Sequence, residues 1–352
     1  MNMSSTATQL EKAYTYDVLN SLLFLASHYI IPCITAIGCF NNLIVIVVLS
    51  RPRYRHHVSC LFLRLLALTD TINLWIGATI MINSAMSTMI RTFGDTFCAL
   101  IGFAVNFTLE MSSWTVVAMT FMRFVAVDFP LKAQQFITFK AAKISLLVIL
   151  LFFFILALPD LLYNRVPRHG DGGHPFQCVL LVPLDVNAAY ELAHYFTAFI
   201  IPFFVLLFLN VGIVLALRRR NKGKQGIRST GENTDDNMVM AMVIAVTLAF
   251  LITTLPLVIH FVLSQKYALG TVVDEYQQKL GTLTYVIGVI FYDLNCAINF
   301  YLYFITCKKF REDFKSLLIT TTRQTSARSK YGAVSYFHPN SPWSPRADPS
   351  PP

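Results

Sequence analysis

Residues 66–70 read Leu-Ala-Leu-Thr-Asp, and they lie near the middle of an apolar stretch that runs from about residue 58 to about residue 83. About 20 mainly apolar residues are enough for a helix to cross the hydrocarbon of a bilayer. Asp70 would then lie at membrane depth, where an ionisable side chain is costly and usually faces the interior of a helix bundle. The stretch therefore predicts a membrane helix with a functional polar group.

Six further apolar stretches of similar length predict six further membrane helices. They lie at about residues 25–49, 97–127, 142–163, 191–217, 238–264 and 281–305. None has the alternation of a barrel strand, and lipid tolerates only helices or closed barrels across its core. The composition agrees, because only 13% of the residues are charged, against about 25% in soluble proteins. We therefore expect an all-α membrane protein whose seven-transmembrane helix bundle covers residues 25–306.

Basic residues are concentrated in alternate connections between the spans. Arginine and lysine are frequent in segments 50–57, 128–143 and 218–237 and after residue 306, and sparse in the other connections. Because cytoplasmic loops are enriched in these residues, we expect an extracellular N-terminus and a cytoplasmic C-terminus. Topology and contact with anionic membrane lipid account for the net charge of +9. No soluble basic domain points to nucleic acid.

The two ends of the chain differ from the spans. Residues 1–24 are expected to form an extracellular N-terminus with a glycosylation sequon at Asn2. Residues 307–319 have apolar residues at helical spacing between charges, which predicts an amphipathic helix on the inner membrane face. Residues 320–352 are rich in serine, threonine and proline, so we expect a disordered cytoplasmic tail whose hydroxyl groups suit phosphorylation.

Two of the seven cysteines, Cys98 and Cys178, are expected on the outer side of the membrane. That compartment is oxidising, so a disulfide between them can persist. The outer loop at residues 164–189 has turn residues followed by the apolar run 176–182. This pattern predicts a β-hairpin that is tied down at Cys178.

The polar, proline and aromatic residues of the spans form an ordered series. In chain order the series is Asn42, Asp70, Cys98, Arg123, Pro202, Phe250, Pro256, Asn295, Asn299 and Tyr303. On seven spans, this series resembles the rhodopsin-like G-protein-coupled receptors over about residues 25–319. The resemblance implies a multi-pass receptor of the plasma membrane that binds an extracellular ligand and signals through a heterotrimeric G protein. It also implies arrestin and a receptor kinase as partners of the tail.

The resemblance further implies a sodium pocket at the membrane centre. Its residues would be Asn42, Asp70, Ser112, Asn295 and Asn299. An ionised carboxylate at this depth needs a cation or several donors. A second interpretation stays open, in which these groups satisfy one another as a polar network. Apart from this allosteric sodium ion, we expect no cofactor and no metal.

The family's coupling and switch residues would be Arg123, Phe250, Pro256 and Tyr303. The sequence departs from the family pattern close to them. The departures are Met122 in place of an acidic residue, Asn210 in place of a tyrosine, Thr254 in place of a tryptophan and Phe300 in place of a proline. Without an acidic neighbour, Arg123 loses a restraint of the resting state, so we expect raised ligand-free signalling. Phe300 removes a source of helix kinking.

Eight polar residues in the outer half of the bundle are candidate ligand contacts. They are Asn106, Glu110, Glu191, His194, His260, Tyr285, Tyr292 and Asp293. Glu110 and Asp293 attract most interest, because intramembrane carboxylates are functional by default and could pair with a basic or amidated peptide. The alternative for His194 and His260 is a satisfied interior histidine, and Glu191 could simply be solvated.

The ligand class is narrowed by what the spans lack. Val105 stands where amine receptors of this family have an aspartate, which argues against a monoamine, and the seventh span has no lysine to hold retinal. The outer loop favours a neuropeptide-type receptor, with a chemosensory receptor for a small molecule as the alternative. A transporter would show interrupted helices in matching halves. No H-E-x-x-H, G-x-S-x-G or P-loop motif suggests an enzyme.

Overall fold

The computed structural model describes residues 17–54, 57–129, 133, 135–166, 178–223, 234–268 and 275–319. The sequon at Asn2 and the tail from residue 320 lie outside these residues. The chain divides into two units, Met1–Lys308 and Lys309–Pro352. A separate helix covers residues 308–319, and its place on a membrane face stays a prediction.

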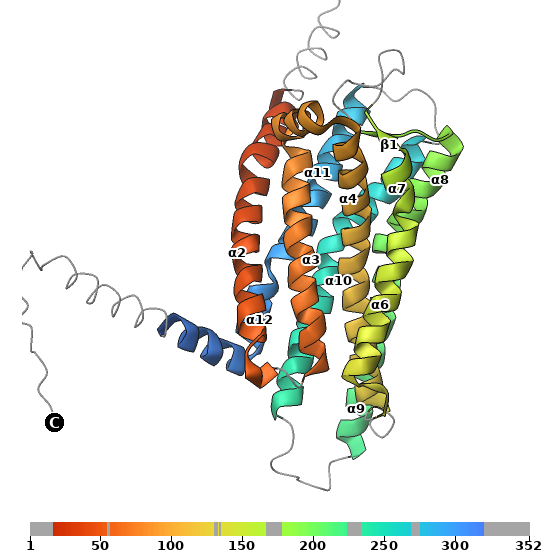
Figure 1. Cartoon of the computed structure of the whole chain (residues 1–352). Coiled ribbons are helices and arrows are strands. Elements are labelled where there is room, and N and C mark those ends of the chain that lie inside the picture. Colours follow the sequence, from red (N-terminus) through yellow and green to blue (C-terminus); the bar gives the residue numbers. More distant parts are fainter. Residues whose placement is uncertain are drawn as a thin grey trace, which may run out of the picture. The chain divides into compact units, whose positions relative to one another are not determined.

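Seven of the described helices are long and apolar enough to cross a membrane. They cover Asp17–Leu49, Val58–Met81, Met86–Asp128, Phe139–Tyr163, Asp185–Arg219, Ala241–Leu263 and Leu280–Ala297. They pack side by side as one bundle (Figure 1). This confirms the predicted all-α membrane protein with seven transmembrane helices. The first helix begins at Asp17, well before the predicted start at residue 25.

Several spanning segments consist of more than one element. The helices are α2 (Ile31–Leu49), α3 (Val58–Met81), α4 (Asn83–Asp128), α6 (Phe139–Leu156), α7 (Leu158–Tyr163), α8 (Leu184–Tyr195), α9 (Ile201–Gly223), α10 (Thr234–Ala268), α11 (Glu275–Ala297) and α12 (Asn299–Thr306). Short π-helical turns, η1 (Ala26–Ile30) and η3 (Phe196–Ile200), precede α2 and α9, and the 3-10 turn η2 (Pro52–Tyr54) follows α2. Gly94, with φ 54° and ψ −133°, bends α4 in a conformation that favours glycine.

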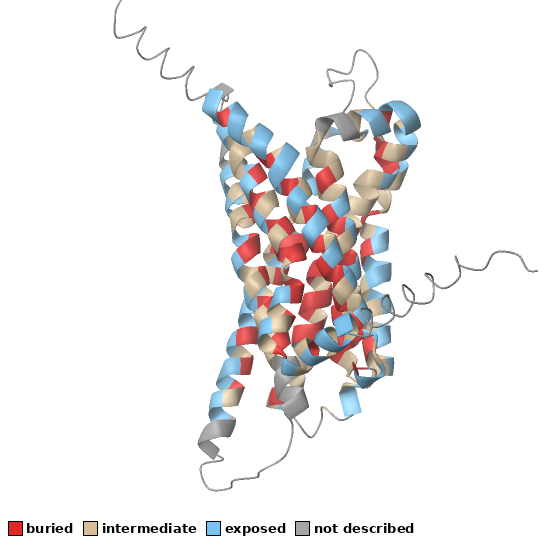
Figure 2. Ribbon diagram, turned by 90° about the vertical axis from the view of Figure 1, so that its left-hand side faces the viewer, coloured by how far each residue is buried: buried red, intermediate tan, exposed pale blue. Residues whose placement is uncertain are grey.

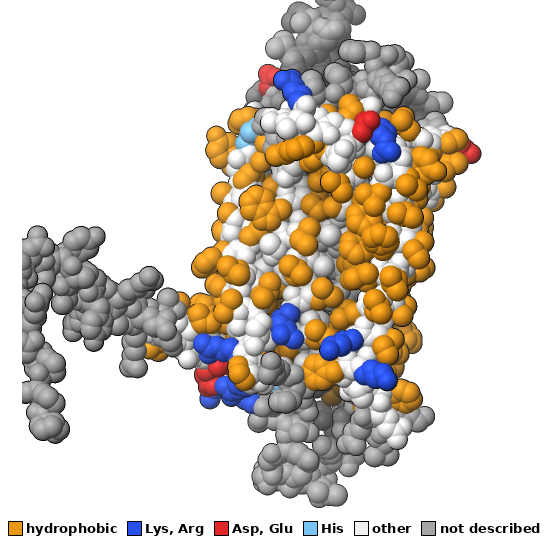
Figure 3. All heavy atoms as spheres, viewed as in Figure 1, with side chains coloured by type: hydrophobic (Ala, Val, Ile, Leu, Met, Phe, Trp, Pro, Cys, Tyr) orange, Lys and Arg blue, Asp and Glu red, His pale blue; other side chains and the backbone are white. Residues whose placement is uncertain are grey.

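The bundle is apolar on its outside as well as inside. Trp75, Phe208 and Ile305 are 63%, 72% and 72% exposed, and Figure 3 shows hydrophobic side chains over the flank of the bundle, with charged side chains toward its ends. Buried residues lie on the faces between helices (Figure 2). An apolar surface of this extent requires a partner. Because seven of the helices are long enough to span a membrane, that partner is lipid.

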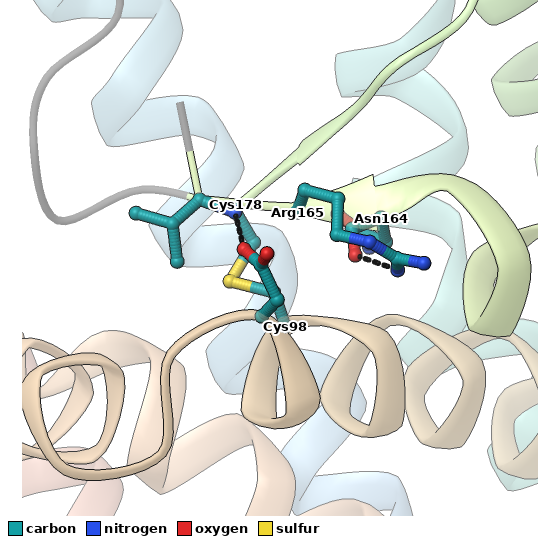
Figure 4. The surroundings of a disulfide bond; sticks show 6 residues. Cys98, Asn164, Arg165 and Cys178 are labelled. Atoms are coloured by element: carbon teal, nitrogen blue, oxygen red, sulfur yellow. Dashed lines mark hydrogen bonds between the residues drawn. A yellow bond between two sulfur atoms is a disulfide. The ribbon is translucent and has the colours of Figure 1, made fainter. Parts of the chain in front are cut away.

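A disulfide and a hairpin close one end of the bundle. Cys98 is bonded to Cys178, and their Cα atoms are 5.3 Å apart (Figure 4). Strand β1 (Asn164–Arg165) pairs antiparallel with β2 (Val179–Leu180). The Val166 N–H donates a hydrogen bond of 2.9 Å to Oδ1 of Asp95. The predicted disulfide and hairpin are therefore confirmed.

The seventh span is interrupted without a proline. Helix α11 ends at Ala297 and α12 begins at Asn299, although Phe300 stands where the family has proline. Carbonyl groups at the end of a helix lack intrahelical partners. The carbonyl oxygens of Cys296 and Ala297 accept hydrogen bonds from the amide groups of Asn42 and Asn41, at 3.1 and 3.2 Å. Amide groups from α2 thus stabilise the interruption, where we expected less kinking.

We predict that Gly38→Ala weakens the packing of α2. An alanine Cβ there would lie 2.5 Å from Cδ1 of Leu74 and 2.8 Å from Cβ of Ala297. Overpacking of this kind costs about 1–3 kcal/mol, so thermal unfolding of the purified protein in detergent should begin at a lower temperature. Gly281→Ala is the matched control, since its Cβ would meet open space. Equal unfolding temperatures for the two variants would contradict the prediction.

Candidate functional site

A cavity of about 630 Å³ lies within the bundle next to the hairpin. Seven of the eight predicted ligand contacts line it, namely Asn106, Glu110, Glu191, His194, Tyr285, Tyr292 and Asp293. Cys178, Val179 and Leu180 also line it, so the disulfide holds part of the cavity wall. The eighth residue, His260, is not among the lining residues, and its Nδ1 lies 2.9 Å from Oγ1 of Thr284.

Glu110 links α4 to the fifth span. Its side chain is fully buried, and Oε1 lies 2.9 Å from Nδ1 of His194 and 2.5 Å from the hydroxyl of Thr197. The indole N–H of Trp114, one helical turn further along α4, donates to the Thr197 carbonyl at 2.8 Å. His194 is therefore a partnered interior histidine at Nδ1. Two further atoms, Nε2 of His194 and Oε2 of Glu110, are buried and have no hydrogen-bond partner among the described residues.

A second buried carboxylate, Asp160 on α7, was missed from the sequence. Its Oδ2 accepts hydrogen bonds of 2.8 Å from both Asn106 and Tyr190, and the residue is buried. The signal was the same one that singled out Glu110, an ionisable residue inside an apolar stretch. Gly102 permits this packing, because a Cβ there would lie 3.2 Å from Oδ1 of Asp160 and 2.1 Å from the amide nitrogen of Asn164.

The opposite wall of the cavity comes from α3 and α11. Asn73 donates from Nδ2 to the Tyr292 hydroxyl at 3.0 Å, and its Oδ1 accepts a hydrogen bond of 2.5 Å from Thr108. These bonds join α3, α4 and α11. Asp293 is 1% exposed, and its Oδ2 has no hydrogen-bond partner among the described residues.

Asp70 lies deeper in the bundle and is also buried. Ser112 donates to its Oδ1 at 2.6 Å, and Asn299 donates to its Oδ2 at 2.7 Å. The thiol of Cys296 also contacts this carboxylate. Within the described part of the chain, neither Asn42 nor Asn295 is hydrogen-bonded to Asp70. The side chain of Asn42 instead donates to the backbone of α11.

The predicted switch residues differ in burial and in the helices that carry them. Phe250 and Tyr303 are almost completely buried, and Arg123 is partly buried. Pro256 lies inside α10. Asn210, a departure from the family pattern, accepts a hydrogen bond of 2.9 Å from Thr247 and so joins α9 to α10. The sequence marked Asn210 as unusual but could not supply its partner.

Comparisons with known proteins agree with a bundle of seven membrane-spanning helices. The family model described as "7 transmembrane receptor (rhodopsin family)" matches residues 41–303. The cysteinyl leukotriene receptor 1 of Sus scrofa is 27% identical over 79% of this chain and 80% of its own length. The FMRFamide receptor of Drosophila melanogaster is 27% identical over 88% of this chain and 57% of its own length. The tachykinin-like peptides receptor 86C of the same species is 27% identical over 79% of this chain and 55% of its own length.

Proposed function

This chain belongs to the rhodopsin family of seven-transmembrane G-protein-coupled receptors, and we propose that an extracellular peptide activates it. The cavity beside the hairpin is the observation that carries the proposal. Its volume can take a few side chains of a peptide, and the hairpin at its edge offers backbone groups to the remainder. A related receptor of Drosophila melanogaster is named for tachykinin-like peptides.

A receptor for a small molecule is the second candidate, because a cysteinyl leukotriene receptor is among the relatives. The charge of the cavity restricts that candidate. Among the described lining residues, Glu110, Asp160, Glu191 and Asp293 are acidic, and none is lysine or arginine. Among these residues an anionic ligand would meet several carboxyl groups and no lysine or arginine, so the described part of the cavity favours neutral or cationic molecules.

The remaining parts of the proposal follow the topology. The N-terminus and the cavity face the exterior, and the opposite end, with Arg123 and Tyr303, meets the heterotrimeric G protein. The tail after residue 319 supplies hydroxyl groups to a receptor kinase and then binds arrestin. Basic residues at the cytoplasmic ends contact anionic lipid in the plasma membrane.

The cavity is connected to α10 by a hydrogen bond that a ligand can influence. The Tyr195 hydroxyl donates to the Leu257 carbonyl at 2.5 Å, and both residues line the cavity. Leu257 follows Pro256, whose ring removes one backbone hydrogen bond from the helix. A ligand that moves Tyr195 therefore acts on α10 next to its proline, where one backbone hydrogen bond is missing. In this way binding favours a second arrangement of the bundle.

Asp70 is the proposed site of a sodium ion, as the family implies. Its donors, Ser112 and Asn299, are neutral groups, so they do not balance the charge of an ionised carboxylate. Oδ1 of Asn42 is a buried acceptor with no hydrogen-bond partner among the described residues. Hydroxyl, amide and carboxylate oxygens suit a hard cation. Asp70 would supply the charge, and Ser112 and Asn299 would orient its two oxygens.

A peptide-library screen with second-messenger readout in cells tests the ligand class. We expect at least one peptide to raise signalling, and we expect the response to disappear in Arg123→Ala while the variant still binds the peptide at the cell surface. Signalling by small molecules alone would contradict the peptide proposal. Substrate uptake without any signalling would favour a transporter instead.

Sodium should stabilise the purified receptor more than potassium does at equal ionic strength. A bound ion adds about 1.4 kcal/mol when its concentration is ten times Kd, and Asp70→Asn should abolish the difference between the two salts. Asp160→Asn is the matched control, because it changes another buried carboxylate, and it should keep the sodium effect. Equal thermal unfolding in both salts would show that Asp70 belongs only to a polar network.

Met122→Asp should lower ligand-free signalling. An aspartate beside Arg123 can restrain the arginine, and a shift of about 1 kcal/mol in the resting equilibrium changes the active population about fivefold. The measurement is second-messenger accumulation without ligand, normalised to surface expression. Met122→Asn controls for polarity without charge and should resemble the wild type. Negligible activity in all three proteins would contradict the expectation.

A further inference from the structure

The acidic residues of the cavity differ in the partners that they already have. Asp160 accepts two hydrogen bonds, from Asn106 and Tyr190. Glu110 has His194 and Thr197 against Oε1, although its Oε2 has no hydrogen-bond partner among the described residues. Glu191 is exposed and accepts a hydrogen bond of 3.2 Å from Asn187. These three carboxyl groups are already engaged by neighbouring side chains.

Asp293 lacks comparable support. It is 1% exposed, it lines the cavity, and no described residue donates a hydrogen bond to its Oδ2. Burial of a carboxyl group without donors is costly, and a carboxylate in such a place gains most from a charged partner. No lysine or arginine is present among the described lining residues, so a cationic group of the ligand can supply the partner, or a proton can neutralise the carboxyl group.

Gly77 lies directly against this carboxyl group. An alanine Cβ at Gly77 would lie 3.3 Å from Oδ1 and 3.8 Å from Oδ2 of Asp293, so a methyl group there would cover both oxygens. Gly77 and Asp293 belong to α3 and α11, and both line the cavity. The glycine thereby leaves the space of one methyl group beside the carboxyl group.

We propose that Asp293 is the cation-binding residue of the ligand cavity and that the ligand places an ammonium or guanidinium group against it. The inference rests on the proposed function in taking this cavity as the ligand site. Glu110 has a different role, since it is a positioning residue that holds α4 to the fifth span. A guanidinium group can donate two parallel hydrogen bonds to one carboxylate, which makes arginine the best match.

Purified full-length receptor can be tested with small probes before any ligand is known. The probes are Nα-acetyl-L-argininamide and Nα-acetyl-L-lysinamide, each compared with Nα-acetyl-L-citrullinamide, which has the shape of the arginine probe without its charge. Thermal unfolding against probe concentration yields an apparent Kd. We expect the arginine or lysine probe to bind about tenfold to a hundredfold more tightly than the citrulline probe, as is usual for hydrogen bonds between charged groups.

The variants separate charge from shape. Asp293→Asn should remove the preference for the cationic probes. Gly77→Ala should weaken the preference although the carboxyl group is still present, whereas Gly281→Ala, with open space around its Cβ, should match the wild type. Equal binding of charged and neutral probes to the wild type would overturn the proposal, as would a preference that survives in Asp293→Asn.

A paired peptide library distinguishes this inference from the proposed function. Each peptide is made with arginine and again with citrulline, and both forms are tested in the signalling assay. Peptides that signal equally well in both forms would leave the receptor a peptide receptor and would refute the role of Asp293. Absence of any peptide signal would count against the peptide ligand, while the probe measurements would still decide whether Asp293 binds cations.

Discussion

Hydrocarbon offers no hydrogen bonds, and this constraint accounts for both the helices and the polar contacts between them. The spanning segments satisfy their backbone groups as helices, and at the end of α11 the carbonyl groups are bonded by Asn41 and Asn42. Buried carboxyl groups obey the same constraint. Asp70 and Asp160 accept hydrogen bonds from helices other than their own, so each holds neighbouring segments together and is itself stabilised by them.

The cavity lies where several of these polar contacts meet the hairpin. Its wall is held by the disulfide at Cys98, by the hydrogen bond from Tyr190 to Asp160, and by the contact of Glu110 with His194. These contacts come from different helices, so the shape of the cavity depends on the arrangement of the bundle. The bond from Tyr195 to Leu257 connects the same wall to the proline of α10. A ligand that changes the wall therefore has a direct physical route to the helix arrangement.

Several features could be predicted because they depend on local sequence. Apolar length predicts the spans, and the outer position of Cys98 and Cys178 predicts their disulfide. Partner choice was harder to predict. Asn42 was assigned to Asp70, but its side chain bonds to the backbone of α11. Asp160 met the same criterion as Glu110 but was not singled out, and His260, a candidate ligand contact, does not line the cavity. Partners depend on how helices rotate against one another, which residue spacing within one helix does not report.

The sequence by itself determined the number of spans, the membrane as their solvent and the family of the receptor, because these follow from apolar length and from the order of a few polar residues. Only the tertiary structure decided which polar residues are satisfied by neighbours and which face the cavity. Glu110 and Asp293 look alike in the sequence, as single carboxylates in apolar spans. The packing of α8 and η3 gives Glu110 partners, whereas no described residue donates a hydrogen bond to Oδ2 of Asp293. The physical reason is that hydrogen bonds between helices are set by the packing of distant segments.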